Sequence, residues 1–180
     1  MTLKDTMQAL RQSFFAYRNG VVAESLRRGG DPHKFIMGCQ LADLLQITAN
    51  TPPNAALAQA LWDDRDHREC RLAATMLYPI SEISADAALQ WAKDVQCIEE
   101  ADVLCHRLLR KIPNAETLWR ELIASDHVLQ QYTALRLLLN LLILERENDH
   151  DAVRRTLNTA HIHPTPSIIA LLHDIDEELI

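Results

Sequence analysis

This 180-residue chain contains only four glycines, and only 5% of its residues are aromatic. Its basic residues are too few to give it a positive net charge. Tight β-hairpin turns depend on glycine, and strands favour aromatic and β-branched residues, so both shortages disfavour sheets. The hydrophobic 48% consists mainly of leucine, alanine and isoleucine, which favours helices and suffices for a core. A formal net charge of −7 argues against a surface that binds phosphate backbones as a whole, although a local basic groove stays compatible with it.

Several sequence signals are missing. No apolar run is long enough to cross a membrane, and the N-terminal residues lack the apolar segment of a secretory signal. The four cysteines, Cys39, Cys70, Cys97 and Cys105, form no C-x-x-C pair. We therefore expect a cytoplasmic protein with free, buried thiols. Glycine-rich phosphate loops and the H-E-x-x-H zinc motif are also missing, so we expect no cofactor and no metal.

An internal repeat organises the chain. Trp62, Trp91 and Trp119 lie 29 and 28 residues apart, and each ends a short segment rich in alanine and leucine. A second apolar-periodic segment follows each tryptophan after a polar break. This pattern predicts an all-α fold, a HEAT-like α-α superhelix built as a right-handed solenoid of about five or six antiparallel helical hairpins. We expect residues 1–180 to form one such domain, with a concave groove lined by the second helix of each pair.

Capping residues mark where these helices begin and end. Plausible N-caps are Asp66, Ser84, Asn114 and Asp126. Pro79 and Pro113 follow helix C-termini, where proline stops a helix. Outside the repeat we expect helices over residues 3–18, 20–28, 34–48, 149–160 and 165–178.

The stretch QCIEEADVLCH, residues 96–106, concentrates reactive side chains. On a helix its apolar stripe comprises Cys97, Ala101, Leu104, Cys105 and Leu108, so the two cysteines are expected in the core. The opposite, polar stripe comprises Glu99, Asp102, His106 and Arg110. Because His106 lies about 100° around the helix from Cys105, a zinc site is not favoured. The polar stripe is either a solvated face or part of the groove.

Four segments carry a resemblance to a known family. They are LWDDRDHRECRLAATML (61–77), the helix 97–112, LIASDHVLQQYTALRLLL (122–139) and HKFIMGCQLADLL (33–45). Together they resemble the DNA alkylation repair family of AlkD type, from about residue 5 to residue 145 and more faintly to the end. The resemblance implies a HEAT-like α-solenoid that removes alkylated purines from DNA.

The resemblance also implies roles for single residues. Asp102 takes the position of the catalytic aspartate, which stabilises the cationic sugar as the base departs. Ile98 stands where a tryptophan is expected. Leu129 and Gln131 stand where a tryptophan and an arginine are expected at the DNA backbone. In the last helix, His173 and Asp176 replace another such pair.

Two functional hypotheses follow from these departures. In the first, which the joint loss of the aromatic and arginine positions and the negative net charge favour, the chain is a non-catalytic binding module that holds a protein segment or structured or damaged DNA in its concave groove. In the second, it is a DNA glycosylase that removes alkylated purines with Asp102. Residues expected to contact nucleic acid in either case are Arg68, Arg71, Arg107, Arg110 and Gln131. Routine surface charge is the alternative for the arginines, since cations favour helix C-termini.

Overall fold

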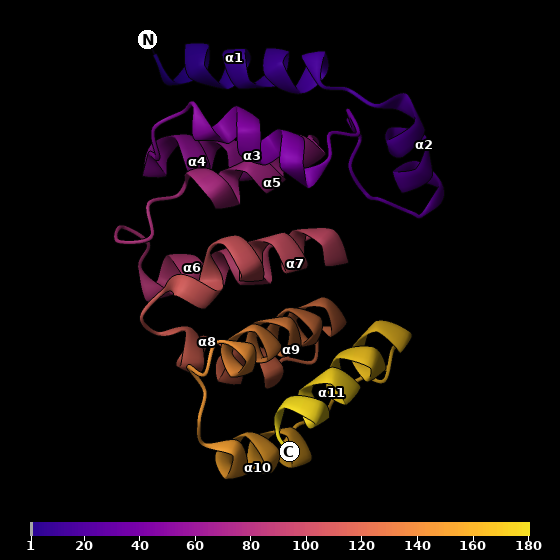
Figure 1. The fold of residues 1–180 in the computed structure, drawn as a ribbon, viewed down its shortest axis with the longest axis vertical. Helices are drawn as coiled ribbons and strands as arrows, with labels where there is room; N and C mark the ends of the chain where they lie inside the picture. Colours follow the sequence, from indigo (N-terminus) through magenta and orange to yellow (C-terminus); the bar gives the residue numbers. More distant parts are fainter. Residues whose placement is uncertain (1) are drawn as a thin grey trace. The chain divides into compact units, whose positions relative to one another are not determined.

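The computed structural model describes residues 2–180, and in that part of the chain every regular element is a helix (Figure 1). A single isolated bridge between Phe35 and His67 is the only β pairing there. The predicted all-α class is confirmed. The chain divides into two compact units, unit 1 up to Ile83 and unit 2 from Ser84. The superhelical arrangement and the single domain therefore stay predictions.

Unit 1 contains five helices: α1 (Leu3–Ala16), α2 (Gly20–Arg28), α3 (Leu41–Ala49), α4 (Ala55–Trp62) and α5 (Arg68–Leu77). Helices α4 and α5 pack closely as a pair, α3 packs on α5, and α1 lies along α3 and α4 (Figure 1). The core contains Phe14 of α1, Leu44 of α3 and Leu72 of α5, all fully buried. Unit 1 is thus held by the leucine-rich faces that the periodicity indicated.

Residues 33–40 differ from the prediction of a helix over 34–48, because the helix begins only at Leu41. Gly38 adopts φ of 79°, and a Cβ there would lie 2.2 Å from the carbonyl oxygen of Asn19. The carboxylate of Glu69 accepts the N–H groups of Met37 and Gly38 at 3.1 and 2.9 Å. Backbone groups bound to a buried carboxylate cannot form helical hydrogen bonds, so this segment is extended and holds α2 in place.

Unit 2 contains α6 (Ala85–Lys93), α7 (Ile98–Arg107), the 3₁₀ turn η1 (Leu109–Lys111), α8 (Ala115–Ile123), α9 (Val128–Ile143), α10 (His150–Thr159) and α11 (Pro166–Glu178). Helix α9 is its centre, since α7, α8 and α11 all pack against it (Figure 1). The three repeat-spaced tryptophans of the chain are buried, as expected for packing residues. No helix in residues 2–180 combines the length and apolarity needed to cross a bilayer.

Most helix limits lie within a residue or two of those expected. The Ser84 side chain caps α6, and α8 begins after Asn114. The N-caps of α5 and α9 are His67 and His127, one residue after the aspartates expected there. Cys97 is the N-cap of α7 and is half-buried, so its place in a buried stripe was wrong.

Candidate functional site

Helix α7 presents Asp102 on its exposed side. The helix begins firmly because Glu100 is buried and accepts the N–H of Gln96 at 2.8 Å. On the inner side, the Cys105 thiol donates to the carbonyl oxygen of Thr133 in α9 at 3.5 Å. Asp102 lies one turn before Cys105 on the side of α7 that borders α9, and its side chain is 38% exposed. Asp102 therefore belongs to a fixed helix and still reaches solvent.

Two side chains of α9 hold the Asp102 carboxylate. The Tyr132 hydroxyl donates to Asp102 Oδ1 at 2.8 Å, and Arg136 Nε donates to the same oxygen at 2.7 Å. Arg136 Nη2 also donates to the Tyr132 hydroxyl at 3.2 Å, which closes a ring of three contacts. Both carboxylate bonds fall on Oδ1, so Asp102 Oδ2 stays available to a ligand.

Sequence reasoning missed Tyr132 and Arg136. They lie four residues apart, one helical turn, and so share a face of α9. A signal was present, because Arg136 is the only charged residue in the sixteen-residue sequence of α9. A lone charge in an otherwise apolar buried helix usually has a specific partner.

The environment fixes the protonation states of both partners. Burial raises the pKa of Tyr132 to about 12, so its hydroxyl is a proton donor at neutral pH. For Arg136, burial alone would lower the pKa, but the hydrogen bond to Tyr132 and the charge of Asp102 outweigh it and raise the pKa. The trio is thus a carboxylate with one neutral and one cationic donor.

A cluster of cations continues the same face beyond Asp102. His106 is exposed one turn later, and its Nε2 lies 3.3 Å from Arg110 Nη2. Burial and the charges of Arg110, Arg107 and Lys111 lower the pKa of His106, so the imidazole is neutral at pH 7. Arg146 positions η1 by donating to the carbonyl oxygens of Arg110 and Ile112. We call Arg107, Arg110 and Lys111 the α7–η1 cation cluster.

The α7–η1 cation cluster is unpaired within an acidic unit. Unit 2 has nine Lys and Arg residues against sixteen Asp and Glu residues, whereas unit 1 has nine of each. Five unit 2 cations form ion pairs with carboxylates: Lys93, Arg120, Arg136, Arg146 and Arg154. None of the three cluster cations does so within residues 2–180, and Arg107 Nε is buried without a hydrogen-bond partner. Burial, and then the charges of Arg110 and Arg107, lower the pKa of Lys111.

Two arginines of α5 predicted to contact nucleic acid are inside unit 1 instead. Arg68 is 3% exposed, and its Nη1 donates to Cys39 O at 3.1 Å and to Glu69 at 2.8 Å. Arg71 is completely buried, donates to the carbonyl oxygen of Trp62 and stacks 3.5 Å from the centroid of that indole. A DNA contact from either arginine would require it to leave these partners.

Gln131 is also buried. Its amide donates to Ser125 O and His161 O at 2.7 Å each and accepts the N–H of His163 at 2.9 Å. It therefore ties the loop before α11 to α9. The DNA-binding role predicted for Gln131, Arg68 and Arg71 stays a prediction, with geometry that gives it no support.

The remaining positions matched to the family form no hydrogen bond or ion pair with Asp102 within residues 2–180. Ile98, one turn before Asp102, is 41% exposed. Leu129 is half-buried at the start of α9. His173 and Asp176 are exposed on α11, where His173 Nδ1 lies 3.7 Å from Glu177.

Comparison with known proteins identifies the family of this chain. The model of the family described as DNA alkylation repair enzyme matches residues 10–163, most of the chain. The chain belongs to the DNA alkylation repair enzyme family. No curated protein and no solved structure shows a significant match to it. The matched range includes α5, α7 and α9, and therefore the whole Asp102–Tyr132–Arg136 trio of this family member.

Three of the four cysteines of this family member, Cys39, Cys70 and Cys105, are buried. Burial raises the pKa of Cys39 and of Cys70 to about 12, and it raises the pKa of Cys105 as well. These three thiols are therefore protonated at neutral pH, which makes them poor nucleophiles.

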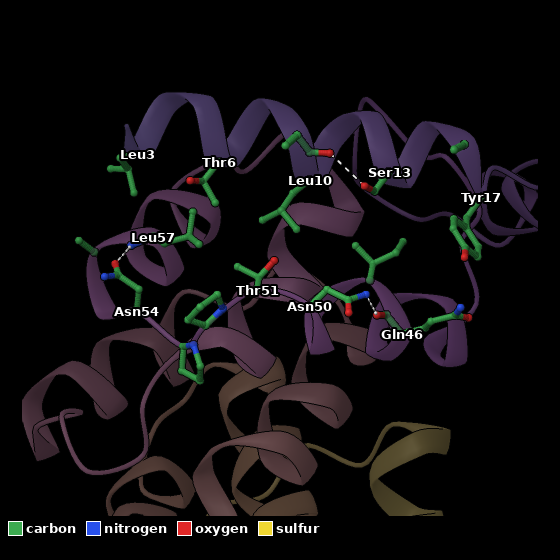
Figure 2. Close-up of a pocket in the computed structure, with 16 residues that line it drawn as sticks. Leu3, Thr6, Leu10, Ser13, Tyr17, Gln46, Asn50, Thr51, Asn54 and Leu57 are labelled. Atoms are coloured by element: carbon green, nitrogen blue, oxygen red, sulfur yellow. Dashed lines mark hydrogen bonds between the residues drawn. The ribbon is translucent and has the colours of Figure 1, made fainter. Parts of the chain in front are cut away.

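Unit 1 also contains a cavity of about 740 Å³ between α1 and the α3–α4 region (Figure 2). Leu10 points into it from α1 and Leu57 comes from α4, while Tyr17, Gln46 and Asn50 lie toward one end (Figure 2). None of its sixteen lining residues is charged at neutral pH. It therefore lacks the cations that would hold a phosphate.

Proposed function

We propose that this protein binds DNA containing alkylated purines and cleaves the bond between the damaged base and its sugar with Asp102. The observation that carries the proposal is the half-exposed Asp102 carboxylate, which Tyr132 and Arg136 hold by Oδ1 alone. A negative group fixed in advance stabilises a positive charge that develops beside it. Family membership supports a role in DNA repair.

The chemistry needs only a fixed carboxylate and water. A purine alkylated at N3 or N7 carries a positive charge, so it leaves with the electron pair of the N-glycosidic bond and becomes neutral. The sugar is left as an oxocarbenium cation, whose charge Asp102 Oδ2 would face. Water then adds to C1′ and loses a proton to solvent or to Asp102. In this scheme Tyr132 and Arg136 are positioning residues, since they act through the carboxylate.

The α7–η1 cation cluster supports binding of the DNA backbone. Three cations without carboxylate partners repel one another, and an entering phosphate would relieve that repulsion. Their position five to nine residues beyond Asp102 would put the phosphate contact about 8 to 14 Å along the helix from the carboxylate. The overall charge of −7 does not oppose this, since eight of the 25 acidic residues lie in residues 145–180.

A second candidate is the non-catalytic binding module, which holds structured DNA or a protein segment without cleaving a bond. Ile98 favours it. The resemblance calls for a tryptophan there, and an exposed aliphatic side chain offers less contact to a sugar than an indole does. In this case Asp102 would be an electrostatic contact alone.

An excision assay decides between the two. The substrate is duplex DNA methylated to contain N7-methylguanine and 3-methyladenine, and the readout is free base released. We expect release by the unmodified protein, loss of at least about 100-fold in Asp102→Asn, and little change in the control Asp126→Asn. Asp126 is an exposed carboxylate of the same unit.

Binding separates the alternatives that remain. If duplex DNA with an abasic-site mimic binds at low salt but no base is released, the binding module is supported and catalysis by Asp102 is not. Equal release by Asp102→Asn and the unmodified protein would also contradict the catalytic role. No binding at low salt would remove DNA as the partner.

A further inference from the structure

Unit 1 contains a second hollow, a cleft of about 450 Å³ where α1 ends, α2 begins and residues 36–37 pass by. Two arginines, Arg18 and Arg27, line it. The other lining residues are small or apolar: Ala16, Gly20, Ala23, Ile36 and Met37. No carboxylate lines this cleft, in a unit that contains nine Asp and Glu residues. The cleft therefore combines positive charge with walls that cannot neutralise it.

Main-chain carbonyls anchor both guanidinium groups without neutralising them. Arg18 Nη1 donates to Phe15 O at 3.0 Å, and its guanidinium stacks 4.2 Å from the centroid of the Phe15 ring. Arg27 Nη2 donates to Ile36 O at 3.2 Å. Neither arginine forms an ion pair within residues 2–180. Because a guanidinium has five N–H groups, each keeps several donors for a ligand.

The neighbouring carboxylates are already engaged. Glu24 of α2 pairs with Arg28 at 3.1 Å, and Asp31 accepts from His33 at 2.7 Å. Neither is therefore free to quench the two arginines. The small lining residues also leave space, since a Cβ added at Gly20 would meet no atom within 4 Å. An anion could approach both guanidinium groups without displacing a side chain.

The Arg18–Arg27 cleft and the larger cavity of unit 1 differ in what they can hold. The cavity of Figure 2 is larger and has a lining without charge, so it offers no counter-charge to an anion. The Arg18–Arg27 cleft is smaller and offers two fixed cations. Arginine matches the geometry of phosphate oxygens with parallel N–H donors, which gives it a preference for phosphate over other anions.

We propose that Arg18 and Arg27 hold a phosphodiester group of the DNA backbone, as a second phosphate contact besides the α7–η1 cation cluster. This inference rests on the DNA binding of the proposed function. Backbone contacts of this kind position a protein on DNA and carry no sequence information. The cleft would thus add affinity without affecting which base is removed.

The test compares two double variants that lose the same charge. One is Arg18→Gln with Arg27→Gln, and the matched control is Lys4→Gln with Lys34→Gln, which removes two exposed cations of unit 1 outside the cleft. Anisotropy of a labelled duplex gives the dissociation constant between 50 and 200 mM salt. Neutralising one phosphate contact lowers the slope of log K against log salt by about 0.9. The unmodified protein should therefore lose roughly threefold more affinity over that range than the cleft variant.

Each result is decisive. Equal slopes in the cleft variant and its control would overturn the inference while leaving the proposed function intact. No binding by the unmodified protein would overturn both. A third experiment identifies the source of the phosphate. It follows the NMR signals of the arginine Nε–H groups while inorganic phosphate, a phosphopeptide or duplex DNA is added. If either probe shifts Arg18 and Arg27 and duplex DNA does not, the cleft binds a different phosphate source and the DNA assignment is wrong.

Discussion

Helices α5 and α7 carry similar charged residues and use them in opposite ways. In α5, Arg68, Glu69 and Arg71 are all at most 3% exposed. In α7 and η1, His106 is exposed, Asp102 and Arg110 are partly exposed, and the cation cluster has no carboxylate partner. The two helices belong to different units, and each is compared in its own surroundings.

What faces a charge decides whether it is structural or available. Arg71 meets the carbonyl group and the ring of Trp62, and Glu69 meets two backbone N–H groups of the extended segment 33–40. Their charges satisfy polar groups that the fold would otherwise bury alone. Asp102 instead meets only Tyr132 and Arg136, and keeps one oxygen toward solvent. The same residue types therefore stabilise one helix and equip the other for a ligand.

The largest expected effect is on the α5 side of this comparison. Arg68→Met should lower the free energy of unfolding by about 3 to 5 kcal/mol, because it leaves the buried Glu69 carboxylate without its cation. Urea unfolding followed by circular dichroism measures it. The control is Arg28→Met, whose exposed i,i+4 pair should be worth less than about 0.5 kcal/mol. A loss below 1 kcal/mol in Arg68→Met would contradict the structural role.

The matched change on the α7 side should spare stability and reduce activity. Asp102 and Arg136 have side chains 38% and 29% exposed, so Arg136→Met should cost at most about 1 kcal/mol of stability. The freed carboxylate loses its orientation, and base excision should fall roughly 10- to 100-fold. Tyr132→Phe removes one of the two hydrogen bonds to Asp102. Its rate of base excision should lie between those of the unmodified protein and Arg136→Met. A large stability loss with unchanged excision would reverse the comparison.

The sequence predicted the helices better than it predicted the site. Periodicity and capping residues located ten of the helices closely, and the exposed position of Asp102 followed from its stripe. The segment 34–40 could not be predicted as extended, because its backbone donates to Glu69, a contact 31 or 32 residues away in sequence. Long-range partners of this kind override local propensity.

The arginine of the site shows the same limit. The resemblance implies an arginine at the DNA backbone where Gln131 stands, and it does not point to Arg136, the arginine of α9 that contacts Asp102. Five residues correspond to a rotation of about 140° on a helix, so the two side chains leave α9 on different faces. The burial of Arg68 and Arg71 has a related reason: their spacing puts them on one face, but only the packing of Trp62 and Cys39 makes that face the inner one.

A smaller effect is expected from the cation cluster. Arg110→Gln should weaken duplex binding about threefold near 150 mM salt and lower the slope of log K against log salt by about 0.9, with stability unchanged within about 0.5 kcal/mol. Arg155→Gln is the control, since Arg155 is an exposed, unpaired cation of the same unit. Anisotropy titrations at several salt concentrations measure both variants. Equal slopes in Arg110→Gln and Arg155→Gln would show that the cations of the cluster contact DNA no more than an exposed cation elsewhere in unit 2.

The smallest expected effect is the titration of His106. Burial and then the charges of Arg110, Arg107 and Lys111 lower its pKa, so the ring should titrate below the ordinary value of about 6.5. Lys111→Gln removes one of these cations and should raise the pKa, and bound duplex DNA should raise it further, because phosphate neutralises the cluster. Two-dimensional NMR of the imidazole measures each shift.

The sign of the accompanying stability change follows from linkage. As the pH falls through about 6.5, the unfolded chain binds the His106 proton before the folded protein does, so this residue disfavours the folded state under acidic conditions. His106→Gln should therefore lose less stability between pH 7 and pH 5 than the unmodified protein. An imidazole pKa at or above 6.5 in the free protein would mean that the cluster is already neutralised. The contrast between the charges of α5, which have partners inside the fold, and the charges of the α7–η1 cation cluster, which are available to a ligand, would then no longer hold.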